Sequence, residues 1–130
     1  MRIMVCYDGS DQSKKAVQLA RLQAGAFDGE VLIVTTLEKG TPENQDEIEA
    51  AKKGLEEAQA LMAAGGIKCH THLLIHGLET GEDLVKFAAE NRIDMAIIGI
   101  IKKSKVGKLF FGSTAQYLIL NAPCPVLTVK

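Results

Sequence analysis

The stretch IIGIIKKSKVGKLFFGSTAQYL, residues 97–118, holds the pattern that decides the fold. Its first residues complete an apolar run that begins at Met95 and stops at Gly99, which is typical of a buried strand. A lysine-rich loop follows, and Gly112-Ser113-Thr114 then opens a segment with helical spacing. Because backbone N–H groups are unpaired at a helix start and the helix dipole is positive there, this turn suits an anion. The stretch therefore predicts a strand, a basic loop and a helix with an anion-binding start.

The same alternation of strand and helix extends over the rest of the chain. Short apolar runs predict the strands 3–7, 31–37, 67–75, 95–98 and 126–129. Helices are predicted to begin near Ser10, Thr41, Thr80 and Ser113, and the first is expected to end near Gln23. The order β-α-β-α-β-α-β-α-β predicts an α/β fold, a five-stranded parallel sheet with helices on both faces. Ligands of such sheets bind at the carboxyl ends of the strands, and two of these ends are Asp8 and Gly99.

The composition limits the classes of protein to consider. A length of 130 residues suits one domain, 1–130, and 47% apolar with 24% charged residues is an ordinary globular mixture. The net charge of −1 favours neither nucleic acid nor an anionic membrane as a partner. No apolar run has the length of a membrane span, and the first residues lack the pattern of a signal peptide. Three cysteines without a CxxC pair argue against a disulfide framework, so we expect a cytoplasmic protein.

The common phosphate-binding loops do not match this chain. No GxGxxG follows the first predicted strand, so a Rossmann dinucleotide site is unsupported. The pair Gly107-Lys108 resembles the end of a Walker A loop, but Lys102 occupies the place of its first glycine and Leu109 that of its Ser/Thr. A response-regulator receiver would need clustered acids after the first strand, where Asp8 is alone.

Three motifs, in order and at suitable spacing, resemble the universal stress protein family over nearly the whole chain. They are VCYDGS at residues 5–10, the loop from Gly99 to Gly112-Ser113, and the ending NAPCPVLTVK at residues 121–130. The resemblance implies an adenine nucleotide α-hydrolase-like fold. It also implies a cytosolic module of the stress response that binds ATP, with Mg²⁺, or AMP.

The family's nucleotide loop consists of a glycine, two free positions, a second glycine, nine free positions, and then Gly-Ser or Gly-Thr. This chain keeps the spacing, with Gly99 first and Gly112-Ser113 last, but Lys102 stands where the second glycine belongs. Glycine permits a positive φ and close approach of the backbone to a phosphate, whereas lysine adds a Cβ and a charge.

The resemblance assigns each matching position a role in nucleotide binding. Asp8 would hold the nucleoside end, and the phosphates would meet Ser113 and Thr114. Thr36 and Leu37 match the place where the family's adenine lies against the backbone. From the residues alone, Asp8 and Ser113 are equally well explained as helix-capping groups.

Two alternatives to a nucleotide-binding module stay open. The first is a universal stress protein that binds no nucleotide and acts as a dimeric interaction scaffold, with partners that the sequence does not name. The second is an enzyme of the related nucleotide α-hydrolases, but no paired nucleophile and base is evident, so no catalytic residue is predicted. We also expect a homodimer, because the apolar strand Val126–Lys130 should lie at a sheet edge, where it would pair with a second copy. The family resemblance implies dimers through the same strand.

The histidines and cysteines of the chain could bind a metal or react, so their roles are also predicted. His70, His72 and His76 share strand parity and so project to one side of their strand. We do not predict a metal there, because the spacing is long and no carboxylate or cysteine shares that parity. Cys6 is expected to be a small buried hydrophobe, and Cys69 is expected to pack on the opposite side of its strand from the histidines.

Overall fold

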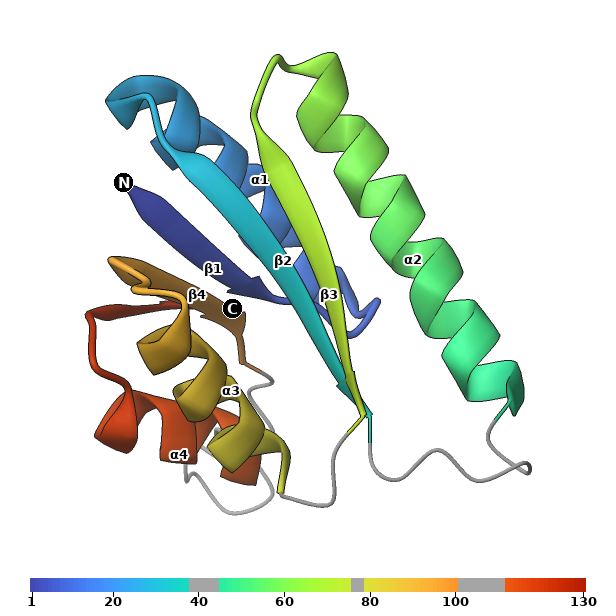
Figure 1. Cartoon of the computed structure of the whole chain (residues 1–130), viewed down its shortest axis with the longest axis vertical. Helices are drawn as coiled ribbons and strands as arrows, with labels where there is room; N and C mark the ends of the chain where they lie inside the picture. Colours follow the sequence, from blue (N-terminus) through green and yellow to red (C-terminus); the bar gives the residue numbers. More distant parts are fainter. Residues whose placement is uncertain (38–44, 76–78, 101–111) are drawn as a thin grey trace.

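The computed structural model describes residues 1–37, 45–75, 79–100 and 112–130, and it contains one parallel sheet (Figure 1). Every strand pair is parallel, and the strand order is β3-β2-β1-β4-β5. The strands are β1 (Arg2–Cys6), β2 (Glu30–Leu37), β3 (Cys69–Ile75), β4 (Met95–Gly99) and β5 (Val126–Val129). The predicted five-stranded parallel sheet is therefore confirmed, with β1 at its centre and β3 and β5 at its edges.

Helices cover both faces of this sheet, as predicted. The described helices are α1 (Asp11–Phe27), α2 (Gln45–Ala64), α3 (Thr80–Glu90) and α4 (Ser113–Asn121). One buried cluster joins the sheet to α1 and α2, and the other joins it to α3 and α4. The predicted start of the second helix at Thr41 lies outside the described residues.

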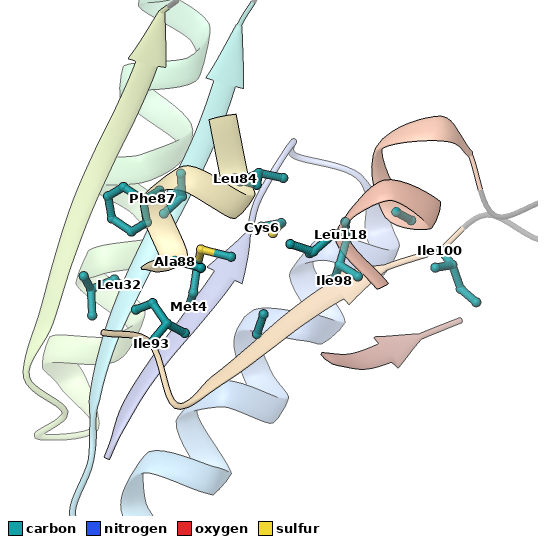
Figure 2. Close-up of a cluster of buried hydrophobic side chains, with 13 residues drawn as sticks. Met4, Cys6, Leu32, Leu84, Phe87, Ala88, Ile93, Ile98, Ile100 and Leu118 are labelled. Carbon is teal, nitrogen blue, oxygen red and sulfur yellow. The ribbon is translucent and has the colours of Figure 1, made fainter. Parts of the chain in front are cut away.

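The alternation of side chains along β1 explains why the central strand is apolar throughout. Ile3 and Val5 belong to the cluster beneath α1 and α2, whereas Met4 and Cys6 belong to the cluster beneath α3 and α4. Figure 2 shows the second cluster, where Met4 and Cys6 lie among side chains of the two shorter helices. A strand that is covered on both faces has no polar position to offer. The burial predicted for Cys6 is confirmed.

Several predicted boundaries are wrong by one to four residues; β1, for example, ends at Cys6 rather than at Tyr7. Helix α1 does not end near Gln23 but continues to Phe27, because Asp28 adopts the left-handed conformation, φ 50°, that ends it. Strand β3 begins at Cys69 rather than two residues earlier. Thr80 does not cap α3: the N-cap is Glu79, which makes no side-chain capping hydrogen bond, and Thr80 is the first helical residue.

The topology sets the position of a ligand site. From β1 the chain proceeds through β2 to β3 on one side of the sheet, and it then crosses to β4 and β5 on the other. The strand order thus reverses between β1 and β4, and in open parallel sheets a crevice forms at the carboxyl ends on either side of such a reversal. Among the described residues, no helix is both long and apolar enough to cross a membrane.

Candidate functional site

A tight turn connects the carboxyl end of β1 to α1. Gly9 has φ 82°, a conformation that suits glycine, and Ser10 is the N-cap of α1. The Ser10 hydroxyl accepts a hydrogen bond from the Ser13 N–H at 3.2 Å, and the Ser13 hydroxyl donates to the Ser10 carbonyl at 2.9 Å. The Ser10 N–H donates to Oδ1 of Asp8 at 2.9 Å. These bonds hold Asp8 in a fixed turn at the carboxyl end of the central strand.

The hydrogen bonds of this turn also set the charge of Asp8. Partial burial raises the pKa of its carboxyl, but hydrogen bonds from the side chain and backbone of Ser10 and from the side chain of Ser13 outweigh it. The net effect holds the pKa of Asp8 below its ordinary value of 3.8. Asp8 is therefore an ionised acceptor at neutral pH.

The end of β4 packs directly under this turn. A Cβ on Gly99 would lie 2.7 Å from the Cβ of Gln12 and 2.8 Å from its carbonyl carbon, so only glycine fits. The next residue, Ile100, donates from its N–H to the Val129 carbonyl at 2.7 Å and is buried in the cluster beneath α3 and α4. Burial in this cluster thus explains why the residue after Gly99 is the bulky, apolar Ile100.

Helix α4 starts on the opposite side of the crevice. Its N-cap is Gly112, with φ 76°, which supplies no side-chain capping bond to the first turn. Ser113 and Thr114 follow as the first two helical residues, so their backbone N–H groups lie at the positive end of the helix dipole. The Thr114 hydroxyl lies 2.5 Å from the hydroxyl of Thr80, the first residue of α3. This arrangement of donors can bind an anion.

These groups surround one cavity of about 400 Å³. It is lined by six of the residues predicted to bind a nucleotide: Asp8, Thr36, Gly99, Gly112, Ser113 and Thr114. Leu37 ends β2 but is not among the described residues that line the cavity. Lys102 and the other lysines of the basic loop lie outside the described residues.

Sequence reasoning missed part of this lining. The missed residues include apolar side chains of the strands and α3, namely Cys6, Val34, Leu84 and Ile98, and the polar residues Tyr7, Ser10, Ser13 and Thr80. Ser10 and Thr80 were recognisable only as helix-start signals, and a start signal does not reveal which cavity the helix faces. The pairing of Thr80 with Thr114 spans 34 positions and leaves no signal in the sequence.

The cysteines do not supply a reactive thiol at neutral pH. Burial, and to a smaller extent the charge of Asp8, raises the pKa of the Cys6 thiol to about 12, and burial raises that of Cys69 to about 11. Burial also raises the pKa of Cys124. Cys69 packs toward α1 and α2, on the side predicted for it.

The histidines of β3 form no metal site in the part of the chain that the structure describes. No group of three His, Cys, Asp or Glu side chains there is placed to hold a metal ion, and His76 lies outside those residues. His72 instead makes an edge-to-face contact with Phe87 of α3, with 4.8 Å between the ring centres. Burial lowers the pKa of His72, as does the nearby His70.

Both the sequence and the structure of this chain are similar to those of known proteins. The sequence model described as "Universal stress protein family" matches residues 1–130. A universal stress protein of Thermus aquaticus is 34% identical, over 98% of this chain and 97% of its own length. A universal stress protein structure from Archaeoglobus fulgidus has a TM-score of 0.90 and 35% identity, covering 100% and 98% of the two chains. One from the same organism in complex with dAMP has a TM-score of 0.85 and 31% identity, with the same coverage.

Proposed function

The chain belongs to the universal stress protein family, and we propose that it binds an adenine nucleotide in the cavity between β1, β4 and the start of α4. One observation carries the proposal: an ionised acceptor, Asp8, and the donor-rich turn of residues 112–114 line the same cavity. A nucleotide needs both, because its ribose presents hydroxyl donors and its phosphate presents anionic acceptors. The likeness to an Archaeoglobus fulgidus relative in complex with dAMP supports the same class of ligand.

In this proposal each part of the cavity meets a different part of the nucleotide. Asp8 accepts hydrogen bonds from the ribose hydroxyls. The N–H groups and hydroxyls of Ser113 and Thr114 bind the phosphate at the helix start. The base lies toward Thr36 and the apolar wall that Val34 provides. A cavity of about 400 Å³ is within the range of small-molecule sites.

The ligand we propose is AMP, or ATP with Mg²⁺. Asp8 is the only carboxylate among the described residues that line the cavity. Because Mg²⁺ prefers oxygen ligands and keeps most of its water, we expect it to arrive on the triphosphate rather than to occupy a protein site. We expect this binding to serve regulation in the cytosol rather than catalysis, since burial raises the pKa of the Cys6 thiol to about 12 and the sequence shows no paired nucleophile and base.

Lys102 is the feature that favours the alternative, a family member without nucleotide. A lysine in place of the loop's second glycine replaces a flexible backbone position with a side chain that carries a positive charge. The alternative function is a dimeric interaction scaffold. Titration with nucleotides distinguishes this scaffold from a nucleotide-binding module.

Isothermal titration calorimetry with AMP, ADP and ATP, with and without Mg²⁺, tests the proposal on the wild-type chain and on Lys102→Gly. We expect the wild-type chain to bind and to be thermally stabilised by the bound ligand, because a native-state ligand raises stability by mass action. No binding to the wild-type chain, together with binding to Lys102→Gly, would overturn the proposal in favour of the scaffold.

We also propose that the chain forms a homodimer through the strand at residues 126–130. Strand β5 lies at a sheet edge and has no strand on its outer side within the described parts of the chain, so its outer backbone groups could pair with a second copy. Leu127 on β5 and Ile119 and Leu120 on α4 are exposed apolar side chains next to that edge in sequence. A dimer formed here would bury them.

Light scattering after size exclusion tests this dimer. We expect Leu127→Glu to convert the dimer to a monomer at micromolar concentration. Leu61→Glu is the matched control, because Leu61 is an exposed leucine on α2, which packs against β2 and β3 at the other edge of the sheet. A monomeric wild-type chain would contradict the dimer, as would a dimer that Leu127→Glu leaves intact.

A further inference from the structure

The starts of α3 and α4 meet at a pair of hydroxyl groups. Oγ1 of Thr80 and Oγ1 of Thr114 lie 2.5 Å apart, at the short end of the range for O–H···O hydrogen bonds. Both residues line the cavity assigned to the nucleotide. The two helices come from different parts of the chain, so this contact is a tertiary feature and not a local cap.

Counting hydrogens shows what this pair offers to a ligand. Each hydroxyl has one hydrogen to donate and two lone pairs to accept with. The contact between them uses one of the two hydrogens, and neither hydroxyl makes another hydrogen bond within the described parts of the chain. One O–H therefore remains to donate, and hydrogen bonds in series strengthen one another.

The packing between α3 and α4 holds the pair in place. A Cβ on Gly81 would lie 2.8 Å from the Cβ of Tyr117, so the two helices touch with no spare room one residue beyond Thr80. Gly81 is buried, and Tyr117 lies one turn after Thr114 on the same helix. The helices therefore cannot approach further, and the backbones that carry the two hydroxyls are in close contact.

We propose that Thr80 is a positioning residue of the nucleotide site. Its hydroxyl donates to Oγ1 of Thr114, which turns the Thr114 hydroxyl so that it donates to an oxygen of the ligand's phosphate. This inference rests on the proposed nucleotide binding and adds a polar residue from α3 to a site whose other proposed ligand contacts come from β2, the turn after β1 and the start of α4. It also predicts a selectivity: the pair discriminates between a nucleotide and the nucleoside that lacks the phosphate.

Titration of AMP and of adenosine against Thr80→Val tests the role of Thr80. Valine keeps the branched shape but removes the hydroxyl, so we expect AMP affinity to fall about fivefold, the ratio that corresponds to one net hydrogen bond of about 1 kcal/mol. Adenosine affinity should not change, because adenosine presents no phosphate oxygen. Thr80→Ser should restore AMP affinity. Thr71→Val is the matched control, since Thr71 lies on β3 and does not line the cavity.

The double variant Thr80→Val/Thr114→Val shows whether the two hydroxyls act in series. If they do, Thr80→Val has no further effect on AMP affinity once Thr114 has lost its hydroxyl. Unchanged AMP affinity in Thr80→Val would overturn the role of Thr80 and leave the proposed function standing. Equal losses for AMP and adenosine would also overturn it, because they would indicate a general distortion of the cavity. Absence of binding of AMP and of ATP with Mg²⁺ to the wild-type chain would overturn both proposals.

Discussion

At the amino ends of the strands, charged side chains neutralise one another, whereas at the carboxyl ends the polar groups surround a cavity. At the amino ends, the Glu30 carboxylate forms an ion pair with Arg2, and it has Lys68 Nζ at 3.5 Å and His70 Nε2 at 3.7 Å. At the carboxyl ends, the described polar lining includes Asp8, Tyr7 and Thr36 near the strand ends, together with hydroxyl and N–H groups of the helix starts.

The difference follows from how a parallel sheet is connected. The carboxyl ends of β1, β3 and β4 lead toward the starts of α1, α3 and α4, and residues of these three helix starts line the cavity. At the start of α4, Gly112 leaves the first N–H groups without a side-chain cap. The amino ends receive helix ends and offer no such donors. At the carboxyl ends of the strands, hydrogen-bond donors and the Asp8 carboxylate are therefore available to a ligand. At the amino ends, the charged side chains pair with one another.

Alanine at Gly99 gives the largest expected effect. A new Cβ there would meet the backbone of Gln12 and Ser13, which cannot move without displacing the start of α1. We expect Gly99→Ala to lower the free energy of unfolding by about 3 kcal/mol, as overpacking of a tight contact does. Urea denaturation measures the change, and calorimetry should record weaker AMP binding as well.

Gly29 provides the comparison at the amino ends. A Cβ there would lie 2.9 Å from the carbonyl oxygen of Met1, but its next nearest neighbours would be 3.5 and 3.6 Å away, whereas all three nearest atoms at Gly99 lie within 3.0 Å. We expect Gly29→Ala to cost about 1 kcal/mol and to leave AMP affinity unchanged. Equal costs for the two variants would contradict the idea that the carboxyl ends are the rigid side of the sheet.

The second prediction exchanges one carboxylate at each end for its amide. Asp8→Asn should weaken AMP binding by about 10- to 100-fold, the loss of about 1.5–3 kcal/mol that accompanies a hydrogen bond to a charged group. Glu30→Gln should leave AMP affinity unchanged, because Glu30 already pairs with its neighbours far from the cavity. Calorimetry on both variants measures the contrast, and similar losses would refute it.

The fold was predictable because its signals are local and repeated. The apolar run of β1, covered on both faces, and the helix-start signal at Ser10 each appear within a few residues of sequence. Alternation of such runs specifies a parallel sheet, and the carboxyl ends of the strands then indicate where Asp8 and Gly99 must meet. Six of the predicted site residues line one cavity for this reason.

The remaining features depend on contacts between distant segments. The sequence predicts a cap at Thr80 from its type alone, yet its hydroxyl pairs with Thr114 on another helix. The end of α1 was misplaced because Gly25 looks like a stop signal, whereas the left-handed residue that ends the helix is Asp28. The resemblance implies that Leu37 lies near the adenine, but a match of position does not give the extent of the cavity, and Leu37 is not among the residues that line it.

The third prediction tests whether the Ser10 hydroxyl at the carboxyl ends stabilises the fold as the N-cap of α1. The Ser10 hydroxyl accepts from the Ser13 N–H, so Ser10→Ala should lower the free energy of unfolding by about 1 kcal/mol. Glu79→Ala is the control at the N-cap of α3, where no side-chain capping bond exists, and it should cost less. Urea denaturation compares the two, and an equal or larger cost at Glu79 would contradict the assignment of Ser10 as the cap.

The smallest expected effect is the pH dependence of the ion cluster at the amino ends. Partial burial raises the pKa of Glu30, but the charges of Arg2, Lys68 and His70 outweigh it and hold this pKa below its ordinary value of 4.5. A carboxyl whose pKa is lower in the folded state stabilises the fold at neutral pH, and this stabilisation is lost as the pH falls below the unfolded value.

Glu30→Gln removes that contribution at every pH. We expect the variant to be less stable than the wild-type chain by less than about 1 kcal/mol at pH 7, since pairs at a surface are screened by solvent. The difference should shrink as the pH is lowered through 4 and vanish where Glu30 is protonated in both states. Urea denaturation at pH 7, 5 and 3 measures it. A difference that grows on acidification would mean that the pKa of Glu30 is raised by folding, and that the charges at the amino ends are not neutralising one another.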